Sequence, residues 1–299
     1  MRAIVTGGAG FIGSHLVDAL ISRGDEVHIV DSLATGRREN LSGGAILHER
    51  DIRESLADLF DEVEPERVFH LAAQADVGTS VEKPELDAEV NVLGTLRVLE
   101  AARSHDAGVV FSSTGGAIYG ECAEPAGEHA ERQPLSPYGT SKLAGEEYLA
   151  TWNRLHGTRH VALRFANVYG PRQLAKLEGG VVAIFMNRLR AGEVGTVFGD
   201  GDQERDFVYV GDIVAAILAA AAGKPGTYNI GTGIATSVNE LWRLCAQASG
   251  GGGDPAYGDA RQGELRRSVL DSSLAARELG WRASTSLEAG LRATWESPG

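Results

Sequence analysis

Short apolar runs rich in Val and Ile alternate with amphipathic runs of helical period through the first half of the chain. The pattern predicts strands near residues 2–6, 26–30, 45–48, 67–71, 108–112 and 160–164, with helices between them. Repeated alternation of strand and helix is typical of an α/β fold, a parallel, doubly wound sheet with helices on both faces. Ligands of such sheets bind at the carboxyl ends of the strands.

The regular alternation stops after Asn167. The stretch Tyr169-Gly170-Pro171-Arg172 begins a smaller, mixed α/β region. The sequence therefore predicts two domains, residues 1–166 and residues 167–299, with segments near 207–232 returning to the first.

The first predicted strand runs into a glycine-rich turn. Gly7, Gly10 and Gly13 form a G-x-x-G-x-x-G pattern between the strand and an amphipathic run that starts at Ser14. Such a turn lets the backbone approach a pyrophosphate, which then sits at the positive end of a helix dipole. This arrangement is typical of a Rossmann dinucleotide-binding domain.

Asp31 ends the second predicted strand. A carboxylate at that place hydrogen-bonds the adenosine ribose hydroxyls and repels a 2′-phosphate, so it favours NAD over NADP. Arg37 and Arg38 are the opposing feature. They fall in a predicted loop and are interpreted as solvated charge.

Tyr138 precedes Lys142 by four residues in the run Ser136-Pro137-Tyr138-Gly139-Thr140-Ser141-Lys142. Residues four apart share one face of a helix. An ammonium beside a phenol favours the phenolate, which makes the tyrosine a usable general base or acid. Together with the glycine turn, the pair predicts redox chemistry at a sugar or alcohol carbon.

Composition narrows the class of partner. The 299 residues carry 28 basic and 41 acidic side chains, a net charge of −13, which argues against nucleic acid or an anionic membrane as partner. The start reads as a strand rather than a signal peptide, and no apolar run is long enough to span a membrane, so we expect a cytoplasmic protein. The 2 Cys and 8 His residues show no metal-site spacing, so no metal is expected. His70 is interpreted as a packed structural histidine.

These motifs resemble those of the extended short-chain dehydrogenases/reductases, and among them the NAD-dependent nucleotide-sugar epimerases, closest to the UDP-glucose (UDP-galactose) 4-epimerases. The resemblance covers essentially the whole chain. Further motifs that carry it are His70-Leu71-Ala72-Ala73-Gln74, Val90-Asn91-Val92-Leu93-Gly94-Thr95, Ser112-Ser113-Thr114, Arg164 to Arg172, Gly199-Asp200-Gly201, Arg205 to Val210, Arg261-Gln262-Gly263-Glu264 and Leu279-Gly280-Trp281.

The resemblance implies that residues 1–166 bind NAD and residues 167–299 bind a UDP-sugar. It places NAD against Gly7, Gly10, Phe11, Ile12, Gly13, Asp31, Ser32, Asp51, Ile52, Leu71, Ala72, Ala73, Gln74, Asn91, Ser112, Tyr138 and Lys142. It places UDP-sugar contacts at Thr114, Tyr138, Asn167, Val181, Phe198, Arg205, Arg261 and Ser268. The family's catalytic hydroxyl falls on Thr114, but the segment is one residue longer than the commonest family form, so Ser113 is a rival.

The reaction that the resemblance implies is reversible oxidation at the sugar C4, with Tyr138 as base and a transient 4-keto sugar. Three alternatives stay open: a UDP-glucuronate or UDP-N-acetylglucosamine 4-epimerase, a nucleotide-sugar dehydratase, and a non-catalytic dinucleotide-binding protein. Gly115 and Gly116 stand where dehydratases carry an acidic residue after the catalytic Thr, which argues against a dehydratase. The intact Tyr138/Lys142 pair argues against a non-catalytic dinucleotide-binding protein.

Ser268 falls where strict glucose/galactose epimerases tend to carry a bulky Tyr, so we expect tolerance of larger sugars. The family's usual homodimer implies partner helices over residues 85–103 and 141–155.

Overall fold

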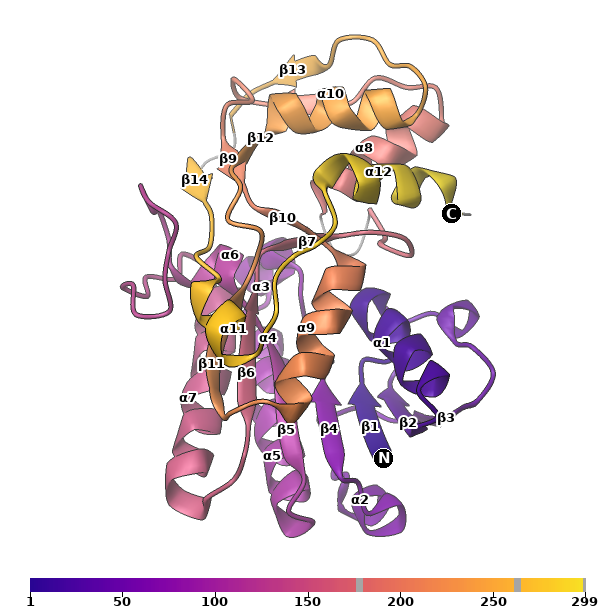
Figure 1. Cartoon of the computed structure of the whole chain (residues 1–299), viewed down its shortest axis with the longest axis vertical. Helices are drawn as coiled ribbons and strands as arrows, with labels where there is room; N and C mark the ends of the chain where they lie inside the picture. Colours follow the sequence, from indigo (N-terminus) through magenta and orange to yellow (C-terminus); the bar gives the residue numbers. More distant parts are fainter. Residues whose placement is uncertain (176–179, 261–264, 298–299) are drawn as a thin grey trace.

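The computed structural model describes residues 1–175, 180–260 and 265–297. Its centre is a seven-stranded sheet in the order β11-β6-β5-β4-β1-β2-β3, in which every neighbouring pair is parallel (Figure 1). The strands are β1 (Arg2–Thr6), β2 (Glu26–Asp31), β3 (Ala45–Glu49), β4 (Arg67–His70), β5 (Gly108–Thr114), β6 (Val161–Phe165) and β11 (Gly226–Ile230). The doubly wound Rossmann fold is therefore confirmed.

Two apolar cores cover the two faces of this sheet. One face packs against α1 (Phe11–Ser22), α9 (Val210–Ala222) and α11 (Ser273–Glu278). The other packs against α2 (Ala57–Val63), α5 (Thr95–Ser104) and α7 (Pro137–His156). Central strands are apolar on both sides because both faces are covered, which explains their continuous Val and Ile runs.

The seventh strand was not among the strands that the apolar runs predict. β11 joins the edge of the sheet beside β6 and follows α9, which packs on β5 and β6. Both elements lie within the segment 207–232 that we expected to return to the first domain. The boundary at residue 166 stays a prediction, because this part of the sheet comes from beyond it.

Shorter elements lie around the carboxyl ends of the strands. They are α3 (Val77–Glu82), α4 (Pro84–Ala88), a π-helical turn (Glu89–Gly94), α6 (Gly115–Ile118) and a 3₁₀ turn (Arg38–Asn40). The long helix α7 begins where the Ser136 hydroxyl accepts from the Gly139 amide, with Pro137 in its first turn, and ends at Gly157 in the left-handed region. The Ser136 cap and Pro137 fix the start of α7 and therefore the position of Tyr138 in its first turn.

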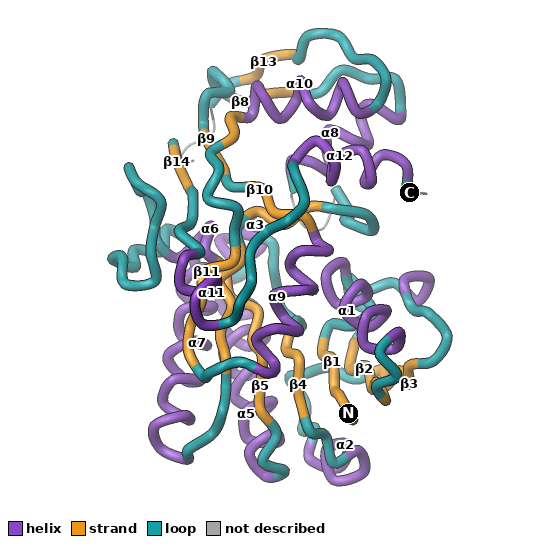
Figure 2. Tube along the Cα trace, in the orientation of Figure 1, coloured by secondary structure: helices purple, strands orange, loops and turns teal. Residues whose placement is uncertain are grey.

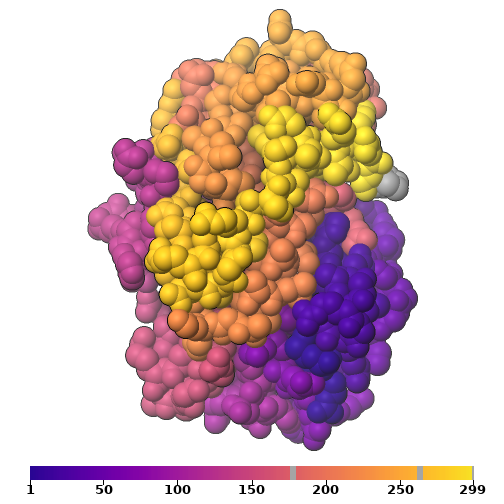
Figure 3. All heavy atoms as spheres, viewed as in Figure 1, coloured from indigo at the N-terminus to yellow at the C-terminus, as the bar shows by residue number. Residues whose placement is uncertain are grey.

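A smaller mixed domain lies at one end of the sheet (Figure 2). Its helices are α8 (Val181–Arg190), α10 (Val238–Ala248) and α12 (Leu287–Glu296). They share one apolar core, which includes Phe185 of α8 and Trp242 of α10. Its strands form the pairs β7 (Asn167–Tyr169) with β10 (Phe207–Tyr209) and β8 (Thr196–Phe198) with β13 (Ala256–Gly258), and the trio β12 (Thr236–Ser237), β9 (Glu204–Arg205) and β14 (Arg267–Ser268). Atoms of the second half of the chain, orange and yellow, also cover part of the visible surface beside the indigo N-terminal segment (Figure 3).

Candidate active site

A cleft of about 670 Å³ opens at the carboxyl ends of β1, β2, β4 and β5. Its walls include most of the residues that the sequence assigns to the dinucleotide. The predicted residues that line it are Gly7, Gly10, Phe11, Ile12, Gly13, Asp31, Ser32, Asp51, Ile52, Leu71, Ala72, Ala73, Gln74, Ser112, Ser113, Tyr138 and Lys142. Residues from four strand ends therefore meet in one cavity, as Rossmann topology requires.

Two glycines of the turn leave no room for a side chain. Gly7 has φ +71°, and a Cβ there would stand 2.6 Å from the backbone nitrogen of Ala72. A Cβ at Gly13 would stand 2.1 Å from the carbonyl oxygen of Gly7. The turn therefore packs tightly against the end of β4 and presents bare backbone and the start of α1 to the cleft. This is a cradle for a phosphate group.

Asp31 is fixed at the end of β2 by two backbone amides. Its carboxylate accepts from Ala9 N at 2.9 Å and from Leu33 N at 2.8 Å, and the residue is 8% exposed. The opposing arginines are engaged elsewhere: Arg37 forms an ion pair with Glu39, and Arg38 with Glu49. Both arginines are exposed, as the solvated-charge interpretation predicts.

Asn91 lies behind the cleft wall rather than in it. It is 2% exposed within the π-helical turn Glu89–Gly94, and its amide exchanges hydrogen bonds with the backbone of Gln74 at 2.9 Å each way. It also donates to Asp87 and to the Ser141 hydroxyl. Asn91 therefore connects the segment after β4 to α7. Its place in a π-helical turn is typical of functional sites.

Tyr138 and Lys142 both line the inner part of the cleft from α7. Lys142 is 3% exposed, and its Nζ donates to the carbonyl oxygen of Ser112 at 3.0 Å. Burial lowers the pKa of Lys142 to about 8, against the carboxylates of Asp87 and Glu146, which raise it. The lysine therefore carries a charge that is only partly compensated and stands one helical turn from the phenol.

The two candidate hydroxyls at the end of β5 face different ways. Ser113 contributes to the cleft wall but is 4% exposed, and its hydroxyl donates to the buried carboxylate of Glu146. Thr114, the next residue, is half-buried and does not line this cleft; its Oγ1 lies on the side of Gly116, as does the Oδ1 of Asn167. Neighbouring side chains of a strand point to opposite faces, which explains the difference.

The remaining UDP-sugar candidates lie in the smaller domain. Val181 begins α8, Phe198 ends β8, and Ser268 on β14 pairs in register with Arg205 on β9. Val181, Phe198 and Arg205 are half-buried, and Ser268 is 7% exposed. None of them lines the dinucleotide cleft. Arg261 lies outside the described residues.

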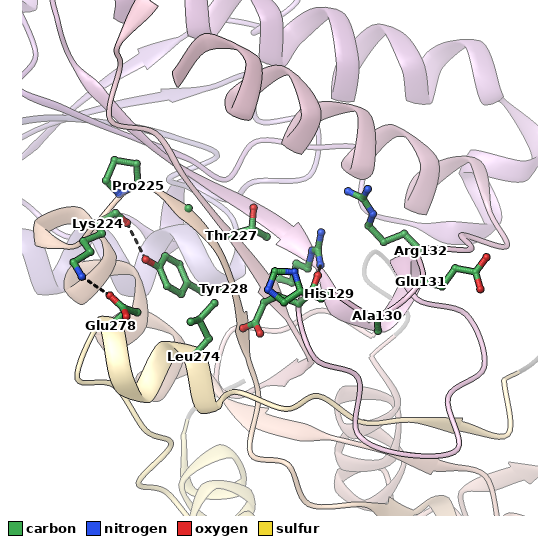
Figure 4. A pocket seen from close by; sticks show the side chains of 13 residues that line it. His129, Ala130, Glu131, Arg132, Lys224, Pro225, Thr227, Tyr228, Leu274 and Glu278 are labelled. Carbon is green, nitrogen blue, oxygen red and sulfur yellow. Dashed lines mark hydrogen bonds and ion pairs between the residues drawn. The ribbon is translucent and has the colours of Figure 1, made fainter. Parts of the chain in front are cut away.

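A second cavity of about 830 Å³ lies at the β11 edge of the sheet (Figure 4). Its walls include Tyr228, whose hydroxyl donates to the carbonyl oxygen of Lys224, and the exposed ion pair of Lys224 with Glu278. Neither Tyr138 nor Lys142 lines it. The redox candidates therefore belong to the first cleft and not to this second cavity.

His70 has the structural role that its apolar strand predicts. It is 1% exposed, and its ring nitrogens hydrogen-bond the hydroxyls of Thr6 and Thr95 at 2.7 and 3.0 Å. Within the described ranges no group of three or more His, Cys, Asp or Glu is placed to hold a metal ion. In the same ranges no helix is long and apolar enough to cross a bilayer.

Sequence reasoning missed several residues at this site. Asp87 holds Gln74 and Asn91 in place, and Glu146 accepts from Ser113. Val168 and Gln173, from the start of the smaller region, also line the cleft. A signal for Glu146 existed, since it stands four residues after Lys142 and so shares its helix face. Asp87 offered no such signal.

Comparison with known proteins agrees with this geometry. The model of the NAD dependent epimerase/dehydratase family matches residues 3–231. A putative UDP-glucose 4-epimerase of Methanocaldococcus jannaschii is 45% identical over 294 residues, which is 97% of this chain and 95% of that protein.

Two solved structures extend the similarity over the whole fold. The UDP-glucose 4-epimerase of Thermotoga maritima, solved with UDP-glucose, is 46% identical with a TM-score of 0.97, over 99% of this chain and 98% of that one. The UDP-glucose 4-epimerase of Thermus thermophilus, solved with NAD, is 45% identical with a TM-score of 0.93, over the same shares of the two chains. The resemblance that the motifs indicated is thereby confirmed, and the chain belongs to the NAD dependent epimerase/dehydratase family.

Proposed function

We propose that this protein is an NAD-dependent UDP-hexose 4-epimerase of the UDP-glucose/UDP-galactose type. The observation that carries the proposal is the Tyr138/Lys142 pair at the inner end of a dinucleotide cleft, in a chain 45% identical along its length to UDP-glucose 4-epimerases. The reaction inverts one carbinol carbon with no net redox change. The enzyme is therefore an isomerase.

The cleft fits NAD. The bare backbone of Gly7 and Gly13 would face the pyrophosphate at the start of α1, and the Asp31 carboxylate would accept from the adenosine ribose hydroxyls. Asp51 and Ile52 would lie along the adenine end, and Leu71 to Gln74 along the middle. When bound, NAD supplies an acceptor for the C4 hydrogen, which the sugar later recovers on its opposite face.

Tyr138 acts as the base for the C4 hydroxyl proton, and returns it when the ketone is reduced. Lys142 supports that role in two ways. Its buried ammonium favours the phenolate, and its other N–H donors would bind the nicotinamide ribose. The bond to Ser112 O holds the lysine in place during turnover.

Thr114 serves as the hydroxyl that hydrogen-bonds the C4 oxygen, with Asn167 beside it. Two features favour Thr114 over Ser113: the Ser113 hydroxyl is already given to Glu146, and Thr114 Oγ1 lies on the side of Gly116 and Asn167. Gly115 and Gly116 supply no carboxyl group for a dehydratase, so that alternative is not favoured.

The smaller domain would hold UDP. Arg205 and Arg261 would grip the diphosphate, because charge-assisted arginine bonds suit phosphate and the protein's net charge of −13 otherwise repels it. Val181 and Phe198 would contact the nucleoside, and Ser268 would stand at the sugar. Tight nucleotide contacts with loose sugar contacts let the 4-keto sugar turn over while UDP stays bound.

The active protein is a homodimer, and its location is the cytoplasm. Support for the dimer comes from exposed apolar side chains on the π-helical turn that precedes α5 and on α7: Leu93 is 46% exposed, Tyr148 37% and Leu155 68%. Trp152, between them on α7, hydrogen-bonds Glu100 of α5, so these helices share one outer face. Leu155→Glu should lower the mass measured by light scattering from two chains to one.

The direct test of function uses purified protein with UDP-galactose and no added dinucleotide. We expect conversion to UDP-glucose up to equilibrium, and release of NAD when the protein is denatured. Tyr138→Phe should keep the NAD but convert the sugar at least ~100-fold more slowly. Full conversion by Tyr138→Phe, or none by the parent protein, would contradict the proposal.

A further inference from the structure

Helix α7 contacts the end of β5 at two successive residues. Lys142 Nζ donates to the carbonyl oxygen of Ser112, and one helical turn further on the Glu146 carboxylate accepts from the Ser113 hydroxyl. Tyr138, Lys142 and Glu146 stand at four-residue intervals, so they form one stripe along the helix. The residue that follows Ser113 is Thr114, the proposed catalytic hydroxyl.

Glu146 is held in a single position by a buried ion pair. Its carboxylate receives three hydrogen bonds from Arg164 on β6, at 2.6, 2.9 and 3.1 Å, and both side chains are 3% exposed. Arg164 also donates to the hydroxyl of Tyr119 at 2.6 Å, and that hydroxyl donates to Asn229 on β11 at 2.7 Å. The carboxylate is therefore braced from β6 and β11 and cannot follow Ser113 if the serine moves.

A buried ion pair is a costly way to stabilise a core, because desolvation of the two charges offsets much of their attraction. A pair of apolar residues of the same volume often stabilises a protein at least as much as a buried ion pair does. The Glu146–Arg164 pair provides a fixed hydrogen-bond acceptor that is oriented toward the end of β5. An apolar pair would not provide this acceptor. Arg164 also contributes to the wall of the second cavity.

We infer that Glu146 and Ser113 are positioning residues of the epimerase: the Ser113–Glu146 bond sets the end of β5 so that Thr114 meets the C4 oxygen. The inference rests on the proposed function. Ser113 thus acts through Thr114, and does not itself touch the sugar. A misplacement of reacting groups by about 1 Å can cost up to ~100-fold in rate.

The test measures kcat, KM, NAD occupancy and melting temperature for Ser113→Ala, with Thr114→Ala for comparison. Ser113→Ala keeps the ion pair, so the chain should fold and retain NAD. We expect its kcat to fall roughly tenfold with KM within about twofold, and Thr114→Ala to lose about 100-fold or more. Ser113→Thr, which restores a hydroxyl, should recover most of the lost kcat. Ser104→Ala and Glu147→Gln, both at exposed sites, are matched controls.

A double-mutant cycle with Glu146→Gln tests the bond itself. Glu146 Oε1 accepts from both Ser113 and Arg164, and Oε2 accepts from Arg164. Glu146→Gln removes the negative charge and turns one of these acceptors into an NH2 donor beside the Arg164 donors, so the bond from Ser113 is weakened. Ser113→Ala should therefore cost less kcat in the Glu146→Gln background than alone. Should Glu146→Gln fail to fold, the Ser113 variants decide alone.

Each result supports or overturns the inference. Parent-like kcat in Ser113→Ala overturns it, as does a loss as deep as that of Thr114→Ala, which would make Ser113 the catalytic hydroxyl. Full additivity in the cycle also overturns it, as does a kcat loss that Ser113→Thr does not relieve. The failure of the proposed function is distinguishable, since the parent protein would then not convert UDP-galactose at all.

Discussion

Lys142 donates a hydrogen bond from Nζ to the carbonyl oxygen of Ser112 at 3.0 Å, and its ammonium lies over the ring of Phe111, 4.8 Å from the centroid. The bond joins the helix that carries the phenol to the strand that carries the proposed catalytic hydroxyl. Because Lys142 is buried, little water competes for its charge. We therefore propose two functions for the lysine, alignment of α7 with β5 and electrostatic support of Tyr138.

Removing that side chain should impair both functions. We expect Lys142→Ala to lower turnover at least ~100-fold and to lose NAD during gel filtration, because the ammonium supports the phenolate and the ribose contact together. NAD content is measured by absorbance after denaturation. Lys83→Ala, at an exposed site, is the control. Equal NAD occupancy in Lys142→Ala would mean that the lysine does not touch the cofactor.

Asp31 should decide which dinucleotide binds. Its carboxylate is fixed by the amides of Ala9 and Leu33, and we propose that it would repel a 2′-phosphate and so disfavour NADP. We expect Asp31→Ser, stripped of cofactor, to gain roughly tenfold or more in reactivation by NADP relative to NAD. Glu62→Gln, at an exposed site on α2, should not change this ratio. An unchanged ratio in Asp31→Ser would place the discrimination elsewhere.

His70 makes the fold sensitive to acid. Burial, and then the charge of Lys142, lower the pKa of His70 to about 3. Below pH 6.5, the ordinary pKa of histidine, His70 is protonated in the unfolded chain but stays neutral in the folded chain. The free energy of unfolding therefore falls as the pH falls from 6.5 toward 3.

Melting temperatures between pH 7 and pH 5 check this. We expect a decline for the parent protein and a shallower decline for His70→Gln, which is less stable at pH 7 because its bonds to Thr6 and Thr95 are weakened. Burial also lowers the pKa of His160, to about 4. His160 should therefore cause part of the fall in melting temperature in both the parent protein and His70→Gln. The exposed His129→Gln is the control. Parallel curves for the parent and His70→Gln would show that His70 is not the group.

Much of this site could be predicted from the sequence because its signals are local. The glycine turn, the strand that ends at Asp31 and the Tyr138/Lys142 spacing each lie within one strand-to-helix unit. Strand alternation could also separate Ser113 from Thr114, but only once the end of β5 is known.

Other features depend on contacts between distant segments. β11 reaches the sheet edge from 60 residues beyond β6, and the register that sets Ser268 beside Arg205 forms only when β9 and β14 meet. The buried charges Asp87 and Glu146 resemble ordinary helix-surface carboxylates in the sequence. Burial by neighbouring elements makes both residues part of the site. The four-residue spacing from Lys142 is a local signal for Glu146, but Asp87 has no such signal.

Ser268 should set the tolerance for larger sugars. The residue is small and buried beside Arg205, so a bulky side chain there would take up space at the proposed sugar position. We expect Ser268→Tyr to lower kcat/KM for UDP-N-acetylglucosamine relative to UDP-glucose, and Ser268→Ala to leave that ratio near the parent's. If the ratio is the same in Ser268→Tyr, the pocket wall lies elsewhere.

The central claim is that the hydrogen at C4 leaves the sugar and returns to it without meeting water. UDP-galactose deuterated at C4 tests it most directly, with the product UDP-glucose analysed by mass spectrometry and NMR after conversion in ordinary water. We expect the deuterium to stay at C4 of the inverted sugar, because a dinucleotide bound in the cleft would accept it and return it without exchange with water. Loss of the label to solvent during inversion would contradict the account, since it would mean that C4 is inverted by proton exchange.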